Sequence, residues 1–342
     1  MENEIKPAGF KYIRQHSIKV IATMPCPLKV PFRELFNFFI ENYNTNNPFH
    51  PIFCPEQNDC TNPELDKILL NAGNEDELPD IYLTSSYNIL FNKSFYHKFV
   101  KTDVLTGYID ETQREHIPDN ILNVLNRHNM GSLAFSSWGV AQDYSVAGIT
   151  KKPASWEEIL DSEFLNQITV HGCHGKAGSS TLLLFLQQQC GNDAIACFAR
   201  NVIDIRHFAL IIKRMDSMDK KRTALNVLPD VAASHIPSWK AVERLHFAEG
   251  CPLNPMILMV KKSKLDNCMP IINFFHSHSF RQMLHKNGYL MPSDIRWSNN
   301  YILPDFERLA TEGYSQVTAD IEKIYQGHLR HNEIDKRLNT KI

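Results

Sequence analysis

Several common sequence features are missing from this 342-residue chain, and each absence excludes a class of function. Neither charge is in excess, because 36 Lys and Arg stand against 38 Asp and Glu, which leaves a formal net charge of −2. A surface that binds nucleic acid or anionic lipid normally carries a basic excess, so we expect neither partner. The sequence also has no run of about 18 apolar residues, so we expect no membrane insertion.

Standard catalytic motifs are missing as well. The sequence has no CxxC pair, no GxSxG elbow and no HExxH segment. The glycines at 172, 175 and 178 suggest a phosphate-binding loop, but Lys176 follows Gly175 in a register that the nucleotide motif does not allow. We therefore expect neither nucleotide hydrolysis nor a catalytic residue of a standard kind, and an enzyme is the less favoured interpretation.

The N-terminal segment does not have the pattern of a secretory leader. Acidic residues come first, and the longest apolar run extends only from Val20 to Ala22. As the sequence stands we expect a cytoplasmic protein, or an extracytoplasmic one if a leader has been removed. The eight cysteines do not require disulfides, since a chain of this size can bury a core without them.

The apolar pattern predicts an α/β protein. In the first half, expected strands at 18–24, 49–54 and 78–86 alternate with helices, which is typical of a parallel sheet with helices on both faces. In the second half a strand at 168–171 leads through the glycine loop into a helix that ends near 190. Further helices are expected over 193–201, 203–215, 236–246, 270–286, 303–311 and 315–328.

Two extended stretches, near 131–145 and 250–261, predict crossings between two lobes. We assign residues 1–136 and 252–290 to lobe 1, residues 137–251 and 291–330 to lobe 2, and residues 331–342 to a polar tail. In open α/β sheets ligands bind at the carboxyl ends of the strands. A hinge between the lobes would bring those strand ends to one ligand cleft.

Three long fragments resemble a known family. KPASWEEILDSEFLNQITV (152–170), EGCPLNPMILMVKKS (249–263) and MPIINFFHSHSFRQMLHKNGYLMPS (269–293) are similar to successive motifs of ABC-transporter solute-binding proteins. With IKVIATM (18–24) and PDIYLTSS (79–86), they extend the resemblance over about 16–330 in the family's order. The nearest class is the type II periplasmic-binding-protein family, in particular its members that bind ferric and other inorganic ions.

The resemblance implies a two-lobed fold in which each lobe is a mixed, mainly parallel sheet flanked by helices. It also implies a solute-binding protein that closes over a small ligand: a metal ion, a small oxyanion or a metal-bearing species. Such a protein would act as a monomer and would serve an ABC-type permease. Two alternatives stay open, namely a cytoplasmic enzyme similar to the pyrimidine synthases of thiamine biosynthesis, and a ligand sensor.

Most candidate site residues follow expected strands or begin expected helices, whereas Trp138, Ser234 and His235 are implied by the resemblance. A helix N-terminus offers free N–H groups to an anion, although a serine there can also be a simple cap. The expected ligand-binding residues are Cys26, Ser85, Ser86, Trp138, His174, Ser179, Ser180, Ser234 and His235. Thiol and imidazole groups bind soft or borderline metals, and the candidate metal ligands are Cys26, His171, Cys173 and Cys251.

One departure from the family's pattern bears on which ligand the protein is expected to bind. Iron-binding members place a tyrosine pair in the second lobe, whereas the corresponding segment here, VLPDVAASHIPSW (227–239), has no tyrosine. It offers Ser234 and His235 instead. The resemblance therefore supports the scaffold more strongly than a ferric ligand.

Overall fold

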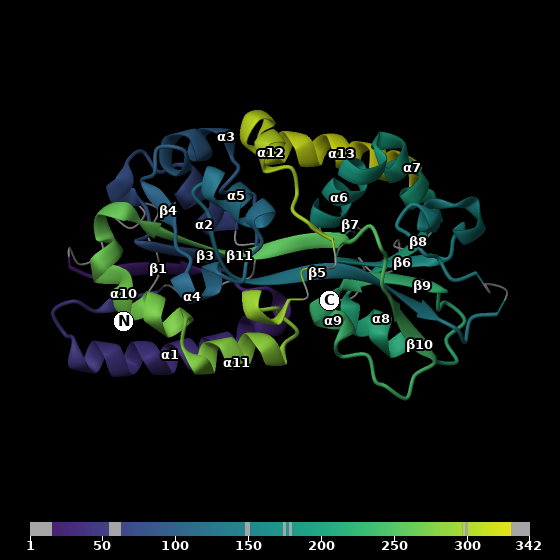
Figure 1. Cartoon of the computed structure of the whole chain (residues 1–342), viewed down its shortest axis with the longest axis horizontal. Coiled ribbons are helices and arrows are strands. Elements are labelled where there is room, and N and C mark those ends of the chain that lie inside the picture. Colours follow the sequence, from purple (N-terminus) through teal and green to yellow (C-terminus); the bar gives the residue numbers. More distant parts are fainter. Residues whose placement is uncertain are drawn as a thin grey trace. The chain divides into compact units, whose positions relative to one another are not determined.

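The chain forms two compact α/β units. The computed structural model describes residues 16–54, 63–147, 151–173, 176–177, 180–295, 297 and 300–329 (Figure 1). Unit 1 comprises Met1–Ser136, Asn254–Ile295 and Phe306–Ser315. Unit 2 comprises Ser137–Leu253, Arg296–Asp305 and Gln316–Ile342.

The C-terminal part of the chain is divided differently from the predicted lobes. The sequence pattern assigns residues 291–330 to lobe 2, whereas 291–295 and 306–315 belong to unit 1. The aromatic ring of Phe306 packs against Phe91 with centroids 4.9 Å apart, and the Tyr314 N–H donates to the carbonyl oxygen of Phe91 at 2.8 Å. These contacts place the segment in unit 1, and an apolar pattern alone does not identify such a partner.

The sheet of unit 1 is mixed. Strand β1 (Ile18–Ala22) pairs in parallel with β2 (Ile52–Phe53) and β3 (Ile81–Thr84). Strand β11 (Cys251–Lys261) runs antiparallel to β3 and to β4 (Leu105–Gly107). All four residues of β3 are buried, as expected for a strand covered on both faces. The predicted α/β class with a mixed sheet is confirmed.

Helices flank this sheet, and an aromatic cluster anchors them. Phe32 and Phe36 of α1 (Lys29–Asn46) are fully buried against Phe275 and Phe280. The other α-helices that lie wholly in unit 1 are α2 (Pro63–Leu70), α3 (Lys93–Phe95), α4 (Glu111–Arg114), α5 (Asp119–Arg127), α10 (Leu265–Phe275), α11 (His278–Lys286) and α12 (Phe306–Glu312). The single helix predicted over 270–286 is therefore two helices. Ser277 ends the run because its hydroxyl accepts from the Phe280 N–H at 3.2 Å and caps α11.

In unit 2, β6 (Ile168–Cys173) lies between two parallel strands, β8 (Val202–Arg206) and β9 (Leu225–Pro229). Strand β5 (Gly131–Asp143), which begins in unit 1, continues antiparallel to β9, and β10 (Val242–Leu245) is antiparallel to β5. Two short strands complete the pairing: β7 (Lys176–Ala177) on β6, and β12 (Tyr301–Ile302) on β11.

Two predicted helices of this unit are wrong. The expected helix over 203–215 is strand β8 followed by the short helix α8 (Phe208–Arg214), and the expected helix over 236–246 contains strand β10. VIDIR alternates apolar and polar residues, which suits a strand beside β6. VERL is mostly exposed and pairs with β5, so its apolar pattern is weak. The remaining α-helices are α6 (Ser180–Cys190), α7 (Asn192–Asn201), α9 (Asp230–Ala233) and α13 (Tyr314–His328).

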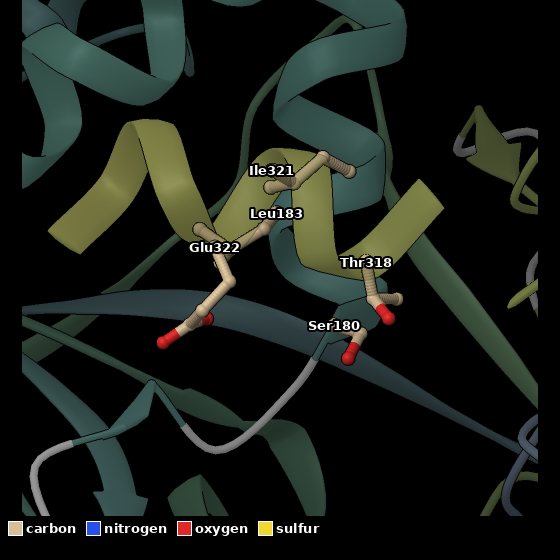
Figure 2. Close-up of a pocket in the computed structure, with 5 residues that line it drawn as sticks. All are labelled: Ser180, Leu183, Thr318, Ile321 and Glu322. Atoms are coloured by element: carbon tan, nitrogen blue, oxygen red, sulfur yellow. The ribbon is translucent and has the colours of Figure 1, made fainter. Parts of the chain in front are cut away.

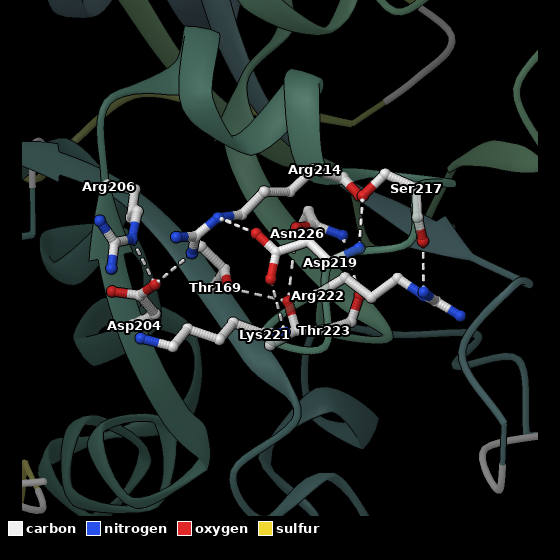
Figure 3. A network of polar contacts seen from close by, with 10 residues as sticks. All are labelled: Thr169, Asp204, Arg206, Arg214, Ser217, Asp219, Lys221, Arg222, Thr223 and Asn226. Atoms are coloured by element: carbon white, nitrogen blue, oxygen red, sulfur yellow. Dashed lines mark hydrogen bonds and ion pairs between the residues drawn. The ribbon is translucent and has the colours of Figure 1, made fainter.

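A polar network holds the carboxyl-terminal end of β8 (Figure 3). The Asp204 carboxylate accepts from Arg206 at 2.5 Å and from Arg214 of α8 at 2.8 Å. Beside it, the Thr223 hydroxyl donates to the Thr169 hydroxyl at 2.8 Å. Because Asp204 is buried, removing either arginine would leave its negative charge only partly neutralised. The network thus determines where β8 ends and where the segment after it begins.

The described helices include none that is both long and apolar enough to cross a bilayer. The longest apolar helix of unit 2, α6, is buried at six consecutive positions, 181–186, which is typical of a helix enclosed by protein.

His276, between α10 and α11, predicts an acid-sensitive stability. Its Nε2 atom is buried without a hydrogen-bond partner among the described residues. Burial lowers the pKa of His276 below 6.5, opposed by the nearby Asp110 carboxylate and assisted by Arg281. Because the folded pKa is the lower one, the unfolded chain takes up the proton first, so stability decreases as pH falls below about 6.5.

We therefore expect His276→Leu to lose less stability than the wild type when urea unfolding is compared at pH 7.5 and pH 5.5. His278→Leu is the matched control, because the His278 side chain is exposed two residues away. Equal losses in the wild type and H276L would contradict the assignment of acid sensitivity to His276.

Candidate functional site

The carboxyl ends of β1 and β3 present hydroxyl groups in unit 1. The Thr23 hydroxyl donates to the Thr84 hydroxyl at 2.9 Å, and the Ser86 N–H donates to the same Thr84 oxygen at 3.0 Å. Between them lies Ser85, whose Oγ is buried without a hydrogen-bond partner among the described residues. An unsatisfied buried hydroxyl is costly unless something else bonds to it. Ser85 Oγ is therefore a candidate contact for a ligand.

Ser86, the other serine expected there, has a different role. Its hydroxyl donates to Asn88 Oδ1 at 2.9 Å, and the Asn88 amide donates to Asp66 at 2.7 Å. Burial raises the pKa of Asp66, and the hydrogen bond from Asn88 opposes that rise. Since its hydroxyl is already engaged, Ser86 is better suited to hold the turn than to contact a ligand.

In unit 2, four rings gather at the carboxyl ends of β6 and β8. His171 stacks on Trp138 of β5, with centroids 5.9 Å apart and an interplanar angle of 28°. The rings of His207 and Phe208 meet His171 edge-on, with centroids 5.7 and 5.6 Å away. The parallel register aligns His171 with Arg206, so the residues that follow β8 lie beside the end of β6. We call Trp138, His171, His207 and Phe208 the ring cluster.

The His171 imidazole is neutral at physiological pH. The pKa of His171 is lowered to about 4, chiefly by burial and to a smaller extent by His207, while the contact with the Arg206 carbonyl opposes this change. The Phe208 N–H donates to Nδ1 at 3.1 Å, and the Arg206 carbonyl oxygen lies 3.3 Å from the same nitrogen. His171 therefore presents a neutral ring with Nδ1 directed at the backbone.

A second polar group surrounds Asp230, directly after β9. Arg244 of β10 donates to Asp230 Oδ1 at 2.6 Å, and the Ser137 hydroxyl donates to Oδ2. The pKa of the nearby Cys251 thiol is raised to about 12, chiefly by burial and to a smaller extent by the Asp230 carboxylate. Metals bind the thiolate, so a thiol that stays protonated is a poor ligand as it stands. We call Ser137, Asp230, Arg244 and Cys251 the Asp230 cluster.

Several expected residues lie elsewhere in unit 2. Ser234 and His235 are exposed beyond α9, and the Ser234 hydroxyl donates to the Val231 carbonyl oxygen at 2.9 Å. Ser180 begins α6 and lines a small pocket against α13 (Figure 2). The other residues that line this pocket are Leu183, Thr318, Ile321 and Glu322. Neither Ser234 and His235 nor the residues that line this pocket belong to the ring cluster.

Four of the predicted site residues fall wholly or partly outside the described structure. His174 and Ser179 lie outside the described residues, as do the side chains of Cys26 and Cys173. Within the described part of the chain, no three or more His, Cys, Asp or Glu side chains are grouped so as to hold a metal ion. His171 and Cys251 belong to separate clusters, one built around Trp138 and the other around Asp230.

Sequence reasoning missed Asp230, Arg244 and His207. A signal existed for two of them, because each directly follows a strand: Asp230 is the first residue of α9, and His207 caps α8. Arg244 gave no such signal, since it lies in the exposed edge strand β10 and meets Asp230 only through the pairing of β10 with β5.

Comparisons with known proteins identify the fold. A family model described as bacterial extracellular solute-binding protein matches residues 76–311. No curated protein matches the chain. Among solved structures, a putative extracellular solute-binding protein from Bordetella parapertussis has a TM-score of 0.62 at 12% identity, covering 93% of this chain and 100% of that one.

Two further structures show the range of ligands on this scaffold. The periplasmic binding protein AfuA from Actinobacillus pleuropneumoniae, with fructose 6-phosphate bound, has a TM-score of 0.60 at 12% identity, covering 91% of this chain and 99% of that one. The ferric binding protein from Campylobacter jejuni has a TM-score of 0.58 at 13% identity, covering 90% and 97%. At these identities the likeness establishes the fold alone.

Proposed function

This chain belongs to the family of bacterial extracellular solute-binding proteins, and on that premise we propose that it binds a small polar solute for an ABC-type permease. The observation that carries the proposal is the ring cluster at the carboxyl ends of β6 and β8, with His171 stacked on Trp138. Such strand ends are where open α/β sheets bind ligands. A flat indole beside a neutral imidazole offers an apolar wall and one polar contact.

Unit 1 supports the same function from its own strand ends. Ser85 Oγ is a buried hydroxyl that lacks a partner among the described residues. A solute with an oxygen or nitrogen atom at this position would complete its hydrogen bonding. Thr23 and Thr84 are already bonded to each other, so the polar contact that remains is Ser85.

The chemistry of the described residues favours an oxygen-bearing solute over a bare metal ion. The Cys251 thiol stays protonated beside Asp230, because burial and that carboxylate raise its pKa to about 12. The two named neighbours differ in ligand, one being a ferric binding protein and the other carrying fructose 6-phosphate, so the scaffold does not select between these classes. A metal ion or metal-bearing species would depend on Cys26, Cys173 and His174, and we keep it as the second candidate.

Thermal unfolding with added solutes tests the proposal. We expect fructose 6-phosphate or inorganic phosphate to raise the melting temperature, with Zn²⁺ and Fe³⁺ giving smaller shifts. A ligand at 100 times its Kd stabilises the folded protein by about 2.7 kcal/mol, which raises the melting temperature by roughly 4 °C for a chain of this size. Metal analysis of the purified protein accompanies the scan. A stoichiometric metal would contradict the oxygen-bearing solute, and no shift with any of the four probes would contradict the proposed ligand classes.

Ser85→Ala separates binding from stability. Because Ser85 Oγ has no partner among the described residues, its removal should leave the melting temperature of the ligand-free protein unchanged or slightly higher. If a solute bonds to Ser85 Oγ, Kd for the best probe should rise about three- to tenfold by calorimetry. Ser234→Ala is the matched control, since Ser234 is exposed and bonds to its own helix. Equal Kd values for S85A and the wild type would remove Ser85 from the site.

A further inference from the structure

The hydrogen bonding at His171 determines which of its ring nitrogens carries the proton. Nδ1 has two backbone neighbours, the Phe208 N–H at 3.1 Å and the Arg206 carbonyl oxygen at 3.3 Å. A neutral imidazole has one N–H and one lone pair, so Nδ1 can serve only one of these neighbours. The choice also determines whether Nε2 offers a proton or a lone pair.

We expect Nδ1 to accept a hydrogen bond from the Phe208 N–H and not to donate one to the Arg206 carbonyl oxygen. Phe208 is the first residue of α8, so its N–H has no partner within the helix. The next N–H, that of Ala209, is already directed at Nδ1 of His207 at 3.4 Å. An N–H group can only donate, whereas a carbonyl oxygen can accept from other groups. A proton on Nδ1 would therefore leave the Phe208 N–H facing another donor and without an acceptor.

We propose that His171 carries its proton on Nε2 and donates that hydrogen bond to an oxygen atom of the solute, and that it is not a metal ligand. This inference rests on the proposed function and deepens it, because it names the chemistry that the solute presents at this residue. A metal-binding histidine needs a lone pair on the coordinating nitrogen and usually donates the other N–H to a carbonyl or carboxylate. Here the amide of Phe208 opposes that arrangement.

The surroundings of the ring agree with a neutral donor. Trp138 covers one face of the ring, and the rings of His207 and Phe208 contact it edge-on, so apolar surface dominates around His171. Burial keeps the pKa of His171 near 4, which leaves the imidazole uncharged at neutral pH. No hydrogen bond joins Nε2 to another of the described residues. A neutral N–H accommodates a phosphate, carboxylate or hydroxyl oxygen alike, and these sources share the same acceptor chemistry.

Nitrogen NMR of the ligand-free protein tests the tautomer directly. The protein is labelled with ¹⁵N-histidine, and long-range ¹H–¹⁵N correlations identify the protonated nitrogen of each ring. His171→Gln, which removes one set of signals, assigns His171, and His207→Gln assigns its neighbour. We expect the His171 signals to show a proton on Nε2 and none on Nδ1 at pH 7. A proton on Nδ1 would overturn the inference while leaving the solute-binding function intact.

A Zn²⁺ titration of the same sample tests the second half of the inference. We expect the His171 proton to stay on Nε2 at all Zn²⁺ concentrations. Transfer of the proton to Nδ1, together with a zinc-bound Nε2, would overturn it. The tautomer measurement needs no solute, so a failure of every probe in the thermal scan would count against the proposed function and not against this assignment.

Discussion

Replacing Asp80 with Ala is expected to lower the free energy of unfolding by about 3–5 kcal/mol, since it would leave the buried ammonium group of Lys261 without a negative partner. Lys261 Nζ lies 3.0 Å from Asp80 Oδ1, and both side chains are buried, 4% and 7% exposed. The other carboxylate oxygen, Oδ2, accepts from the Lys19 N–H at 2.8 Å. Asp80 thereby joins β1, β3 and β11, and the carboxyl ends of β1 and β3 carry the hydroxyl groups of unit 1.

A double-mutant cycle distinguishes the ion pair from the hydrogen bond. Asp80→Asn keeps an acceptor for the Lys19 N–H and removes the charge, and Lys261→Met keeps most of the side-chain volume. We expect each single variant to be destabilised, and the double variant to recover part of the loss because neither buried charge is then left alone. Urea unfolding at pH 7 gives the four free energies.

Lys262→Ala is the matched control for this cycle. Lys262 is the next residue along the chain and pairs with Asp103, but its side chain is 65% exposed. An exposed pair contributes about 0–1 kcal/mol, so the control should remain close to the wild type. A loss in D80N no larger than the loss in K262A would show that burial adds little to the Asp80–Lys261 pair.

The coarse fold could be predicted because its signals are local. IKVIA and IYLT are short apolar runs between turns, so each can be recognised as a strand from its own residues. The requirement for glycine at Gly107 and Gly131 could not be predicted in this way, because it comes from contacts with another segment of the chain. A Cβ atom on Gly131 would lie 2.1 Å from the Tyr108 carbonyl oxygen, which is a contact between different segments. Strand β10 was missed for the same reason, since only its pairing with β5 makes VERL extended.

The candidate site was predictable from the sequence only in part. His171 was predicted because it ends an apolar strand, and Trp138 was implied by the family resemblance; the structure stacks the two rings. The partners of His171 depend on the register of β6 and β8, which aligns it with Arg206 and brings His207 beside it. Cys251 also lies at a strand end, but its protonation depends on its burial and on Asp230, and neither can be inferred from the local sequence around Cys251.

Two of the fragments that carry the family resemblance, KPASWEEIL and EGCPLNP, meet at Trp156. The indole N–H donates to the Gly250 carbonyl oxygen at 2.8 Å, and the Trp156 backbone N–H donates to the Glu249 carboxylate. The ring packs edge-on against Phe185 and Phe247. Gly250 has φ of +99°, and a Cβ atom there would lie 1.4 Å from the Asn300 carbonyl oxygen, so this position requires glycine. Through these contacts Trp156 holds together two segments of unit 2 that lie far apart in the sequence, KPASWEEIL and EGCPLNP.

Trp156→Ala is accordingly expected to lower the free energy of unfolding by about 3–5 kcal/mol, because it empties a large buried site. Trp156→Phe keeps an aromatic ring and loses the donor to Gly250, so we expect a loss of about 1–3 kcal/mol. Trp239→Ala is the control, since that indole is 73% exposed and should contribute less than about 0.5 kcal/mol. Urea unfolding of the three variants measures these differences. If W156F were as stable as the wild type, the hydrogen bond to Gly250 would contribute nothing, and shape alone would explain the tryptophan in this motif.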